Sequence, residues 1–440
     1  MARVLAEAVS EVVLISFLKE GAMGGMVRDW LWFWGRPTAD PEAIRALRDR
    51  RIRKLVRHAW ENVPYYRRLF DEAGVRPEEI RRAEDLQRIP TTTRKQRQGL
   101  PLEDKLARGV DWRRCVSHQT SGSTGRPDTI YRTWWEDQVL LLHRLRAGVQ
   151  LGARPHHRYV NVGITDTKRV LPRWMGLLPF VRLDPYIEPR NVVAELVRSR
   201  PHYIRARPTV LEMALIHDTA GELGKIGTKI VFCGAETMAP AMRRRFEEAF
   251  RARVFDIYGA HEFNMIAWSC AECDYYHTVD DSVYLEVLKD GRPAGPGEEG
   301  DIVATALHSY AMPFIRHETG DVARLPAKPA ACRISFGTIE SLQGRACEFI
   351  RLSSGRVINP TQTYQVLRAV EGVGRFEVVQ TARDSIRVTI EPLPRANDPC
   401  PEVLRSCRRV FGDDVTIEVA STPELTPRNS EKHRYIRALE

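Results

Sequence analysis

KIVFCGAETMAPAMRRRFEEAFRARVFDIYG, residues 229–259, contains two short apolar runs separated by a longer amphipathic segment. The two runs are predicted as buried strands, and the segment between them, 239–250, has the apolar spacing of a helix. A strand, a helix and a second strand in this order form a unit with parallel strands. Ligands of open α/β sheets bind at the carboxyl ends of the strands, where Glu236, Tyr258 and Glu262 fall. We therefore expect an α/β fold with a ligand site at this edge.

A second informative stretch is Thr120-Ser121-Gly122-Ser123-Thr124-Gly125-Arg126-Pro127. Small residues and hydroxyls leave backbone N–H groups accessible to an anion, so the stretch is typical of a phosphate-binding loop. It differs from the common P-loop, because Gly-x-x-x-x-Gly-Lys-Ser/Thr does not occur in the chain. The same composition is also typical of a surface linker, so the interpretation depends on the segments that accompany it.

The composition indicates a globular protein of more than one domain. The chain has 440 residues, of which 43% are apolar, enough to bury a large core. Its formal charge is +10, but the basic residues are spread along the chain, so an arginine-rich composition explains the charge better than a nucleic-acid site does. No signal peptide is recognised, so we expect a cytoplasmic protein whose eight cysteines are thiols or metal ligands rather than disulfides.

The segment from Val12 to Gly35 is the most apolar part of the chain. Lys19, Glu20, Arg28 and Asp29 interrupt it, so a membrane span is not expected. Helices packed on the protein are the favoured interpretation, with loose attachment to a membrane surface as the alternative.

Hydrophobic periodicity predicts further elements on both sides of the strand–helix–strand unit. We expect a helix at 41–62, strands at 282–288 and 301–307, a hairpin at 348–358, a helix near 361–370, strands at 376–380 and 385–391, a helix at 401–410 and a strand at 415–419. The pattern changes after Gly344-Arg345, where the last elements make a unit of about a hundred residues. We therefore expect a large N-terminal domain, 1–345, which opens with a helical segment, 1–62, and a small C-terminal domain, 346–440.

Five segments resemble, in order, the motifs of the adenylate-forming superfamily. They are the loop at 120–127, Tyr258-Gly259-Ala260-His261-Glu262, Thr319-Gly320-Asp321, Gly344-Arg345 and the C-terminal Lys432. The superfamily comprises acyl-CoA synthetases, peptide-synthetase adenylation domains and luciferases. The resemblance implies a large domain with parallel and mixed sheets flanked by helices, followed by a small mobile α+β lid.

Within the superfamily, the chain is most similar to the phenylacetate-CoA ligase-like branch, which includes proteins of the capsule-biosynthesis and coenzyme F390 synthetase type. The similarity rests on Asn62-Val63-Pro64-Tyr65-Tyr66, Ile89-Pro90-Thr91-Thr92-Thr93 and Pro313-Phe314-Ile315-Arg316. It covers the chain from about residue 55 to the C-terminus.

The resemblance implies an enzyme that joins a carboxylic acid to Mg-ATP, releases pyrophosphate and passes the acyl group to a nucleophile, usually CoA. A carboxylate is a poor electrophile, so such a protein must hold the α-phosphate in line and neutralise developing charge. The implied ATP-binding residues are Thr120, Ser121, Gly122, Ser123, Thr124 and Gly125 at the phosphates, Gly234, Ala235, Glu236, Tyr258 and Gly259 at the adenine, and Asp321 with Arg345 at the ribose. Thr124 is also implied in catalysis, and Glu262 as a ligand of Mg²⁺, a hard cation that prefers oxygen.

Each motif has a simpler interpretation when taken alone. Glu262 could be an ordinary surface carboxylate, and Thr319-Gly320-Asp321 could be a turn stabilised by its Asp. The occurrence of the whole set in the expected order favours the nucleotide site.

Lys432 is the best single candidate for a catalytic residue. Between Pro329 and the C-terminus all other basic side chains except histidine are arginines. An ammonium is a compact point charge, whereas a guanidinium is a wide planar fork, so a lysine retained here suggests that its shape matters. By resemblance it contacts the substrate carboxylate and the α-phosphate, and the lid that carries it turns about a hinge after Gly344-Arg345. The alternative is a surface lysine in a frayed tail.

The chain departs from the family pattern at several positions. His261 stands where relatives usually have Thr or Ser, which makes it a candidate to donate a hydrogen bond to the α-phosphate. His317 replaces a common Tyr, and Glu431 replaces the glycine before the catalytic lysine. At the hinge, Arg345-Ala346-Cys347-Glu348 lacks the acidic pair of many relatives. These departures leave adenylation as expected and the acceptor of the second step open.

Cys270-x-x-Cys273-x-x-x-His277 has the spacing of a zinc knuckle. Cys332 lies where some members of the branch carry cysteines and completes a Cys₃His set. Four protein ligands leave no open position, so we expect a structural Zn²⁺. Free cysteines beside a surface histidine are the alternative.

The sequence does not identify the carboxylic acid that serves as substrate. The candidate lining residues Trp134, Tyr258, Ala260 and Phe263 favour an aromatic or mainly apolar acid, with CoA as the expected acceptor. An amine or hydroxyl acceptor is the second enzymatic hypothesis, and a catalytically weak nucleotide-binding scaffold is the third. We expect small-molecule partners, no nucleic acid and no membrane contact, and a homodimer is among the arrangements that the sequence allows.

Overall fold

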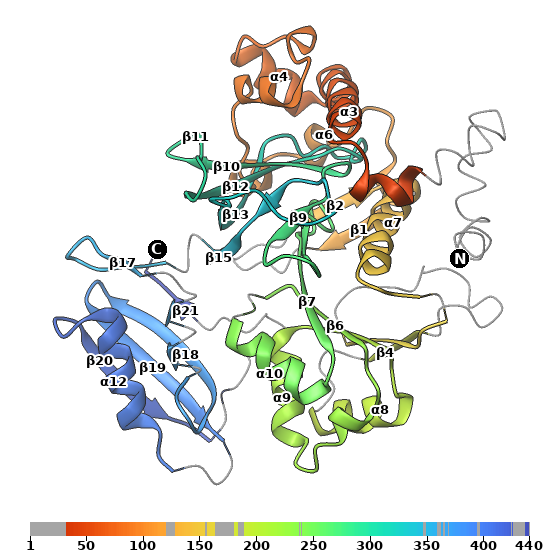
Figure 1. Ribbon diagram of the computed structural model, residues 1–440. Coiled ribbons are helices and arrows are strands. Elements are labelled where there is room, and N and C mark those ends of the chain that lie inside the picture. The colour runs from red at the N-terminus through yellow and green to blue at the C-terminus, as the bar shows by residue number, and fades with distance from the viewer. Residues whose placement is uncertain are drawn as a thin grey trace.

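The predicted strand–helix–strand unit lies in the middle of an eight-stranded sheet (Figure 1). The computed structural model describes residues 32–119, 128–154, 156–162, 180–183, 189–236, 238, 240–345, 349–358, 362–363, 366–367, 369–393, 397–423, 425 and 436–439. Within them, β6 (Ile230–Gly234) and β7 (Arg253–Tyr258) run parallel and are joined by α10 (Pro240–Phe250), which confirms the prediction. The first four residues of β6 are buried, as expected for a central strand of a parallel sheet.

The strands of this sheet follow the order β14-β9-β8-β7-β6-β5-β3-β4. The remaining strands are β3 (Tyr159–Val162), β4 (Phe180–Leu183), β5 (Tyr203–Ala206), β8 (Ala267–Ser269), β9 (Tyr276–Thr278) and β14 (Thr338–Ile339). The pairs among β4, β3, β5, β6 and β7 are parallel, and those from β7 to β14 are antiparallel. Its associated helices are α7 (Trp134–Gln150), α8 (Pro189–Ser199), α9 (Pro208–His217) and the short η6 (Glu222–Lys225).

A second, antiparallel sheet lies above the first in Figure 1 and has the order β11-β10-β12-β13-β15. Its strands are β10 (Val283–Lys289), β11 (Arg292–Pro293), β12 (Glu299–Ala306), β13 (His317–Arg324) and β15 (Ser341–Arg345). The two expected strands, 282–288 and 301–307, are therefore confirmed as β10 and β12. The edge strand β14 belongs to the first sheet, although β13 and β15 on either side of it belong to the second. The chain thus joins the two sheets twice within this short stretch.

A helical layer formed by the N-terminal residues packs against the second sheet. Its elements are η1 (Arg36–Thr38), α3 (Pro41–Asn62), α4 (Pro64–Glu72), η2 (Pro77–Glu79), η3 (Ala83–Arg88), α5 (Arg94–Gln98), α6 (Leu102–Lys105) and η4 (Trp112–Arg114). The side chain of Asp40 accepts a hydrogen bond from the backbone N–H of Glu42 and so caps α3, which ends before Pro64. The buried residues of this layer form one core with Leu307 and Ile315 of the sheet side.

The buried carboxylate of Asp281 joins the N-terminal residues to the middle of the chain. It accepts hydrogen bonds from Arg36 (3.0 Å) and Arg146 (2.6 and 2.8 Å), and its residue has no exposed surface. Burial alone would raise the pKa of Asp281, but Arg146 and His143 hold it well below its usual range. The carboxylate is therefore a structural anchor between η1, α7 and the start of β10.

The C-terminal unit is the α+β layer at the lower left of Figure 1. It contains a hairpin of β16 (Ile350–Arg351) and β17 (Val357–Ile358), and a sheet of order β20-β19-β18-β21 with α12 packed against it. Their bounds are Val373–Ala382 for β18, Ser385–Pro392 for β19, Cys400–Phe411 for α12, Thr416–Ser421 for β20 and Ile436–Arg437 for β21. The predicted hairpin, strands and helix are confirmed. The helix expected near 361–370 lies partly outside the described residues.

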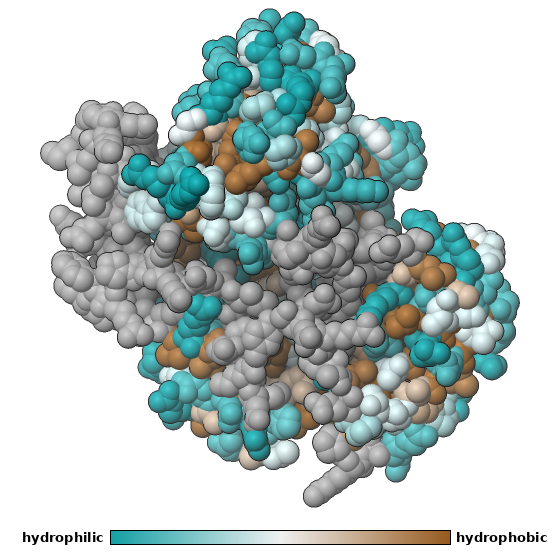
Figure 2. Space-filling model, turned by 180° about the vertical axis from the view of Figure 1, so that it is seen from behind, coloured by the Kyte–Doolittle hydropathy of each residue, from teal (hydrophilic) through white to brown (hydrophobic). Residues whose placement is uncertain are grey.

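Hydrophilic side chains cover the outer surface of the lobe that contains α3 and α4, and hydrophobic residues form separate patches between them (Figure 2). Among the residues that the structure describes, no helix combines the length and the apolar character needed to cross a bilayer. The apolar segment before Trp32 lies outside those residues.

Candidate nucleotide site at the carboxyl ends of the central strands

Tyr258, the last residue of β7, points to the Thr319-Gly320-Asp321 motif of β13. Its hydroxyl donates a hydrogen bond to Asp321 Oδ2 at 2.7 Å and lies 3.2 Å from Thr319 Oγ1. Thr319 Oγ1 accepts from the backbone N–H of Asp321, and Gly320 between them has a φ of +78°. The two predicted motifs are thus brought together from different sheets. A carboxylate can accept several hydrogen bonds at once, as recognition of the two ribose hydroxyls requires.

Neighbouring backbone leaves no room for a side chain at Gly259, which follows Tyr258, or at Gly234, the last residue of β6. A Cβ placed on Gly259 would lie 2.0 Å from the carbonyl oxygen of Asn264, and one on Gly234 would lie 2.8 Å from that of Ile257. Ala235 has a φ of +70°, a conformation that a non-glycine residue adopts at a cost. The ends of β6 and β7 are therefore held as closely packed backbone without bulky side chains, at the place where the resemblance puts the adenine.

Glu236 has a structural task that the sequence did not reveal. Its carboxylate accepts hydrogen bonds from the backbone N–H of Thr209 at 3.0 Å and from the Thr209 hydroxyl at 2.8 Å. Arg207 lies 3.8 Å from the same carboxylate. Glu236 therefore fixes the start of α9 to the end of β6, and the predicted contact of Glu236 with adenine remains a prediction.

Glu262, the predicted Mg²⁺ ligand, is buried and paired with a cation. Only 6% of the residue is exposed, and Oε1 accepts a hydrogen bond from the Arg94 guanidinium at 3.1 Å. Burial alone would raise the pKa of Glu262, but the nearby Arg94 cation, with which it is hydrogen-bonded, lowers it below its ordinary value. Glu262 is therefore a carboxylate, and a second cation next to it would meet a preformed anionic oxygen.

Two neighbours hold the Glu262–Arg94 pair in place. Thr93 caps α5 by accepting from the backbone N–H of Gln96, so Arg94 is the first residue of a defined helical turn. Burial lowers the pKa of His317 to about 3, and its Nδ1 lies 3.1 Å from Thr92 Oγ1. The imidazole is therefore neutral at pH 7, and the direct ion pair of Glu262 is with Arg94. Sequence reasoning missed Arg94, because nothing in its local pattern points to Glu262.

The strands that flank the phosphate-loop stretch reach the same site. β1 (Val116–Gln119) and β2 (Thr129–Arg132) pair as an antiparallel hairpin, and the guanidinium of Arg132 donates to the backbone carbonyl of His261. The end of β2 therefore lies beside the 258–262 motif. The loop residues Thr120 to Gly125, Lys432 and the side chain of Arg345 lie outside the described residues, so their roles remain predictions.

The candidate lining residues of the acid pocket have different surroundings. Phe263 has no exposed surface, and its ring lies 6.0 Å from that of Phe314. Trp134, at the start of α7, is 37% exposed and contacts Trp135 edge to face, with ring centroids 4.5 Å apart. Ala260 packs against the same core as Phe263. Their contact with a substrate remains a prediction.

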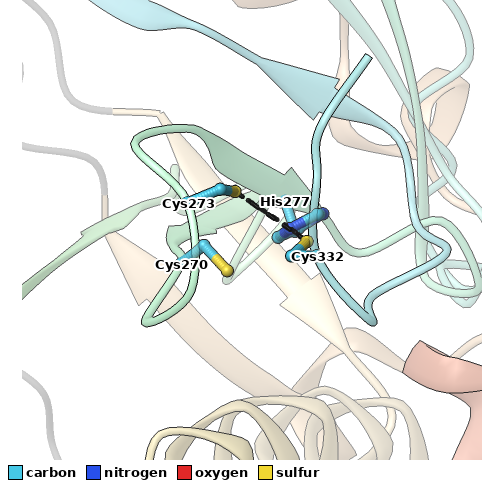
Figure 3. Close-up of side chains that lie close together, drawn as sticks. All are labelled: Cys270, Cys273, His277 and Cys332. Atoms are coloured by element: carbon cyan, nitrogen blue, oxygen red, sulfur yellow. Dashed lines mark hydrogen bonds between the residues drawn. The ribbon is translucent and has the colours of Figure 1, made fainter.

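Cys270, Cys273, His277 and Cys332 form one cluster, as the sequence predicts (Figure 3). The first two lie in the loop between β8 and β9, His277 lies on β9, and Cys332 comes from the segment between β13 and β14. All four ligand atoms lie within 4.8 Å of one another. The sulfurs of Cys273 and Cys332 are 3.8 Å apart, and His277 Nε2 lies 3.1 Å from the sulfur of Cys332.

These distances suit a tetrahedral ion. With zinc–sulfur bonds of about 2.3 Å, two thiolates of a tetrahedron lie about 3.8 Å apart. His277 Nδ1 lies 3.2 Å from the carbonyl oxygen of Phe336, which can only accept, so Nδ1 carries the proton. Nε2 therefore presents its lone pair to the cysteines. This is the arrangement in which a backbone carbonyl orients a metal-binding histidine.

We predict that Tyr258→Phe raises the KM for ATP about tenfold. The variant removes a hydrogen bond to a carboxylate, a contact of about 1.5–3 kcal/mol, from the residue expected to bind the ribose. The measurement is the KM for ATP in pyrophosphate release. Tyr276→Phe is a matched control, because Tyr276 donates a 2.7 Å hydrogen bond to the buried carboxylate of Asp256 and not to Asp321. A similar KM change in both variants would show a general loss of stability rather than a role in nucleotide binding.

No model of a known protein family matches the chain. Phenylacetate-coenzyme A ligase of Escherichia coli (strain K12) is 29% identical over 380 residues, which cover 80% of this chain and 84% of that protein. The phenylacetate-coenzyme A ligase of Thermus thermophilus is 29% identical over 370 residues, which cover 78% and 79% of the two chains.

Solved structures show the same fold at lower identity. 2-Hydroxyisobutyryl-CoA ligase in the postadenylation state aligns over 92% of this chain and 91% of its own, with a TM-score of 0.77 and 21% identity. In its thioesterification state with 2-HIB-AMP and CoA, the same ligase aligns with a TM-score of 0.63 and 22% identity. In its motifs, its curated relatives and its fold, the chain is similar to the adenylate-forming superfamily and, within it, to the phenylacetate-CoA ligase-like branch.

Proposed function

We propose that this protein is an AMP-forming ligase that activates a carboxylic acid with Mg-ATP and transfers the acyl group to CoA. The proposal rests on the hydrogen bond between Tyr258 and Asp321. Tyr258 also lies a few residues before Glu262, whose carboxylate is buried. A nucleotide site needs an acid for the ribose and an acid for the metal ion, and here Tyr258, at the carboxyl end of the parallel strand β7, brings the two together. The names of the curated relatives, phenylacetate-CoA ligases, support the same reaction.

In the proposed first step, a carboxylate oxygen of the acid attacks the α-phosphorus of ATP, and the bond from that phosphorus to the pyrophosphate oxygen breaks. In the second step, the CoA sulfur attacks the acyl carbon, loses its proton, and AMP leaves. Asp321 and Tyr258 would hold the ribose so that the α-phosphate stays in line with the attacking oxygen. His261 and Thr124 would donate hydrogen bonds to the phosphates. Lys432 would neutralise the negative charge that develops between the substrate carboxylate and the α-phosphate.

Glu262 fits a magnesium ion by its chemistry. It offers an ionised oxygen, which Mg²⁺ prefers, and its present cation is the partly exposed Arg94, whose side chain can move away. Mg²⁺ bound there would neutralise charge on the ATP phosphates. The chain would supply one carboxylate and the phosphates would supply further oxygens, which is how proteins commonly hold this ion.

The Cys270, Cys273, His277 and Cys332 cluster fits a structural zinc ion. Its three sulfurs and one nitrogen are a common donor set for Zn²⁺, and the 3.8 Å between the sulfurs of Cys273 and Cys332 is the separation expected around a tetrahedral ion. With four protein ligands, no position remains for a substrate. Zinc would fasten the β8–β9 hairpin, which continues from the site strand β7, to the segment that follows Asp321.

The test of the proposed function is ATP-dependent pyrophosphate release with aromatic, heteroaromatic and aliphatic acids, with and without CoA. We expect release with one class of acid, AMP as the second product, and sustained turnover only when CoA is present. Turnover that does not depend on CoA would indicate an amine or hydroxyl acceptor. ATP binding without release for every acid would contradict a ligase and support the scaffold hypothesis. We propose the cytoplasm as the setting of the reaction, and a homodimer remains a prediction.

We predict that Lys432→Ala lowers the rate of pyrophosphate release roughly 100-fold, because it removes one positive charge from the transition state of adenylation. ATP binding should change little, since the loop, Tyr258 and Asp321 remain. The measurement is single-turnover formation of the acyl-adenylate beside equilibrium ATP binding. Lys328→Ala, which removes a lysine outside the proposed site, is the control. Wild-type adenylation in Lys432→Ala would refute the assignment of this lysine.

A further inference from the structure

One side of α7 carries charged residues beside the proposed site. Arg132, just before the helix, is 3% exposed and donates to the carbonyl of His261. Its other terminal nitrogen lies 3.8 Å from Asp137 on the first turn of α7. Asp137 in turn contacts His118 of β1, with Nε2 and Oδ1 2.7 Å apart. Burial lowers the pKa of Arg132, so this cation is held where water solvates it poorly.

A second arginine follows two helical turns after Asp137 on the same side of α7. Arg144 donates one hydrogen bond, to the side-chain oxygen of Asn264, and its Nε is buried with no partner among the described residues. Burial, with Arg205 close by, lowers the pKa of Arg144 to about 9. Arg205 comes from β5 and hydrogen bonds to Tyr159 on the neighbouring strand β3. Both side chains are partly buried, so two cations lie close together with reduced access to water.

The charge of Arg144 is not compensated by a direct ion pair among the described residues. Asp137 attracts Arg144 through space, but the contacts of its carboxylate are to His118 and Arg132. A buried cation is stable when a hydrogen-bonded anion accompanies it, and a buried donor without an acceptor has a cost. Arg144 is therefore suited to receive an anionic group from a ligand.

The position of Arg144 indicates which ligand brings that anion. His261 and Asn264, which Arg132 and Arg144 contact, lie in the segment that directly follows Tyr258. Arg132 lies beside His261, which the proposed function places at the ATP phosphates, so the phosphates are a source of negative charge at that end. Arg144 lies about 10 Å beyond Asp137 along the axis of α7. A group on the acid is the better source there.

We propose that the acid activated by this protein carries a second anionic group, such as a distal carboxylate, which Arg144 and its neighbours bind. The inference rests on the proposed ligase function and names its substrate class. It is compatible with an acid whose middle part is aromatic or apolar, because only the group distal to the reacting carboxylate would contact the arginines. It differs from phenylacetate, the acid in the names of the curated relatives, which has a single carboxylate.

The test compares matched pairs of acids in pyrophosphate release: pentanoate with glutarate, and phenylacetate with 4-carboxyphenylacetate. We expect kcat/KM to be at least about tenfold higher for the dicarboxylate in at least one pair. In Arg144→Met, kcat/KM for that dicarboxylate should fall about 10- to 100-fold, while the monocarboxylate and the KM for ATP change less than about threefold. Arg144→Lys, which keeps the charge, should retain part of the preference.

Controls separate this inference from a general effect. Arg67→Met removes an exposed arginine, paired with Asp71 on α4, and should leave the acid preference unchanged. Thermal unfolding identifies a variant that fails to fold, and the preference of the wild-type protein is informative without any variant. Equal or better use of the monocarboxylates contradicts the inference and leaves the ligase proposal standing. An equal loss for both acids with a raised KM for ATP would assign Arg144 to the phosphates and also contradict it. No release with any acid would overturn the ligase proposal itself.

Discussion

Glu262→Gln is expected to lower the rate of acyl-adenylate formation roughly 1000-fold at fixed Mg²⁺. The amide retains the size of the side chain but loses the charge that would hold the metal ion, and it leaves Arg94 without its anion. Part of the loss should be recovered by raising the concentration of Mg²⁺, because a weaker ligand needs more metal. The measurement is pyrophosphate release as a function of Mg²⁺ for both proteins.

Glu286→Gln provides a matched control for this experiment. Glu286 is also 6% exposed and accepts two hydrogen bonds from Arg316, at 3.1 Å each, but it lies on β10 outside the proposed site. Its replacement breaks the same kind of buried pair and should cost stability without changing the dependence on Mg²⁺. If both variants lost activity equally and neither responded to Mg²⁺, Glu262 would be a structural residue only.

Cys273→Ser is expected to abolish zinc binding and to lower the free energy of unfolding by about 3 kcal/mol, a fall in Tm on the order of 5–10 °C. A hydroxyl is a poor ligand for zinc, and the three remaining ligands would no longer close the tetrahedron around the ion. The purified wild-type protein should contain about one zinc ion per chain, by elemental analysis. Treatment with a strong chelator should lower its Tm by a similar amount.

Cys115→Ser is the control for the zinc experiment, because Cys115 is a half-exposed cysteine thiol outside the cluster. It should keep both the zinc content and the Tm. Wild-type protein that holds no zinc, together with a Tm that chelators do not change, would show that the four residues form a cluster of thiols and an imidazole without an ion. The cysteine substitution would then act through packing alone.

Local patterns predicted a large part of the fold. β6, α10 and β7 were predictable because apolar runs and helical spacing lie within one short stretch, and α3 because its apolar positions recur every three or four residues. The Cys270–His277 spacing predicted the cluster for the same reason. Cys332 was found only through the resemblance, because a partner 55 residues after His277 leaves no local pattern.

The contacts that set the charges of the site were not predictable. Arg94 meets Glu262 across 168 residues, and Arg144 meets Asn264 across 120 residues. In an arginine-rich chain neither arginine differs from its many neighbours in sequence. Glu236 has a contact of the same kind: its place after a strand indicated a ligand contact, which stays a prediction, but nothing in the sequence indicated that its carboxylate binds the start of α9. Only the packing of the sheets distinguishes these cases.

The core shared by the N-terminal layer and the second sheet affects how the chain folds during its synthesis on the ribosome. The apolar residues between Ile52 and Ala107 are buried with Leu307 and Ile315, which are made much later. At translation rates of about 5–20 residues per second, the roughly 200 residues between them take on the order of 10–40 s to synthesise. During that interval the apolar faces of the first helices have no native partner, so the nascent chain depends on chaperones or transient contacts to avoid aggregation.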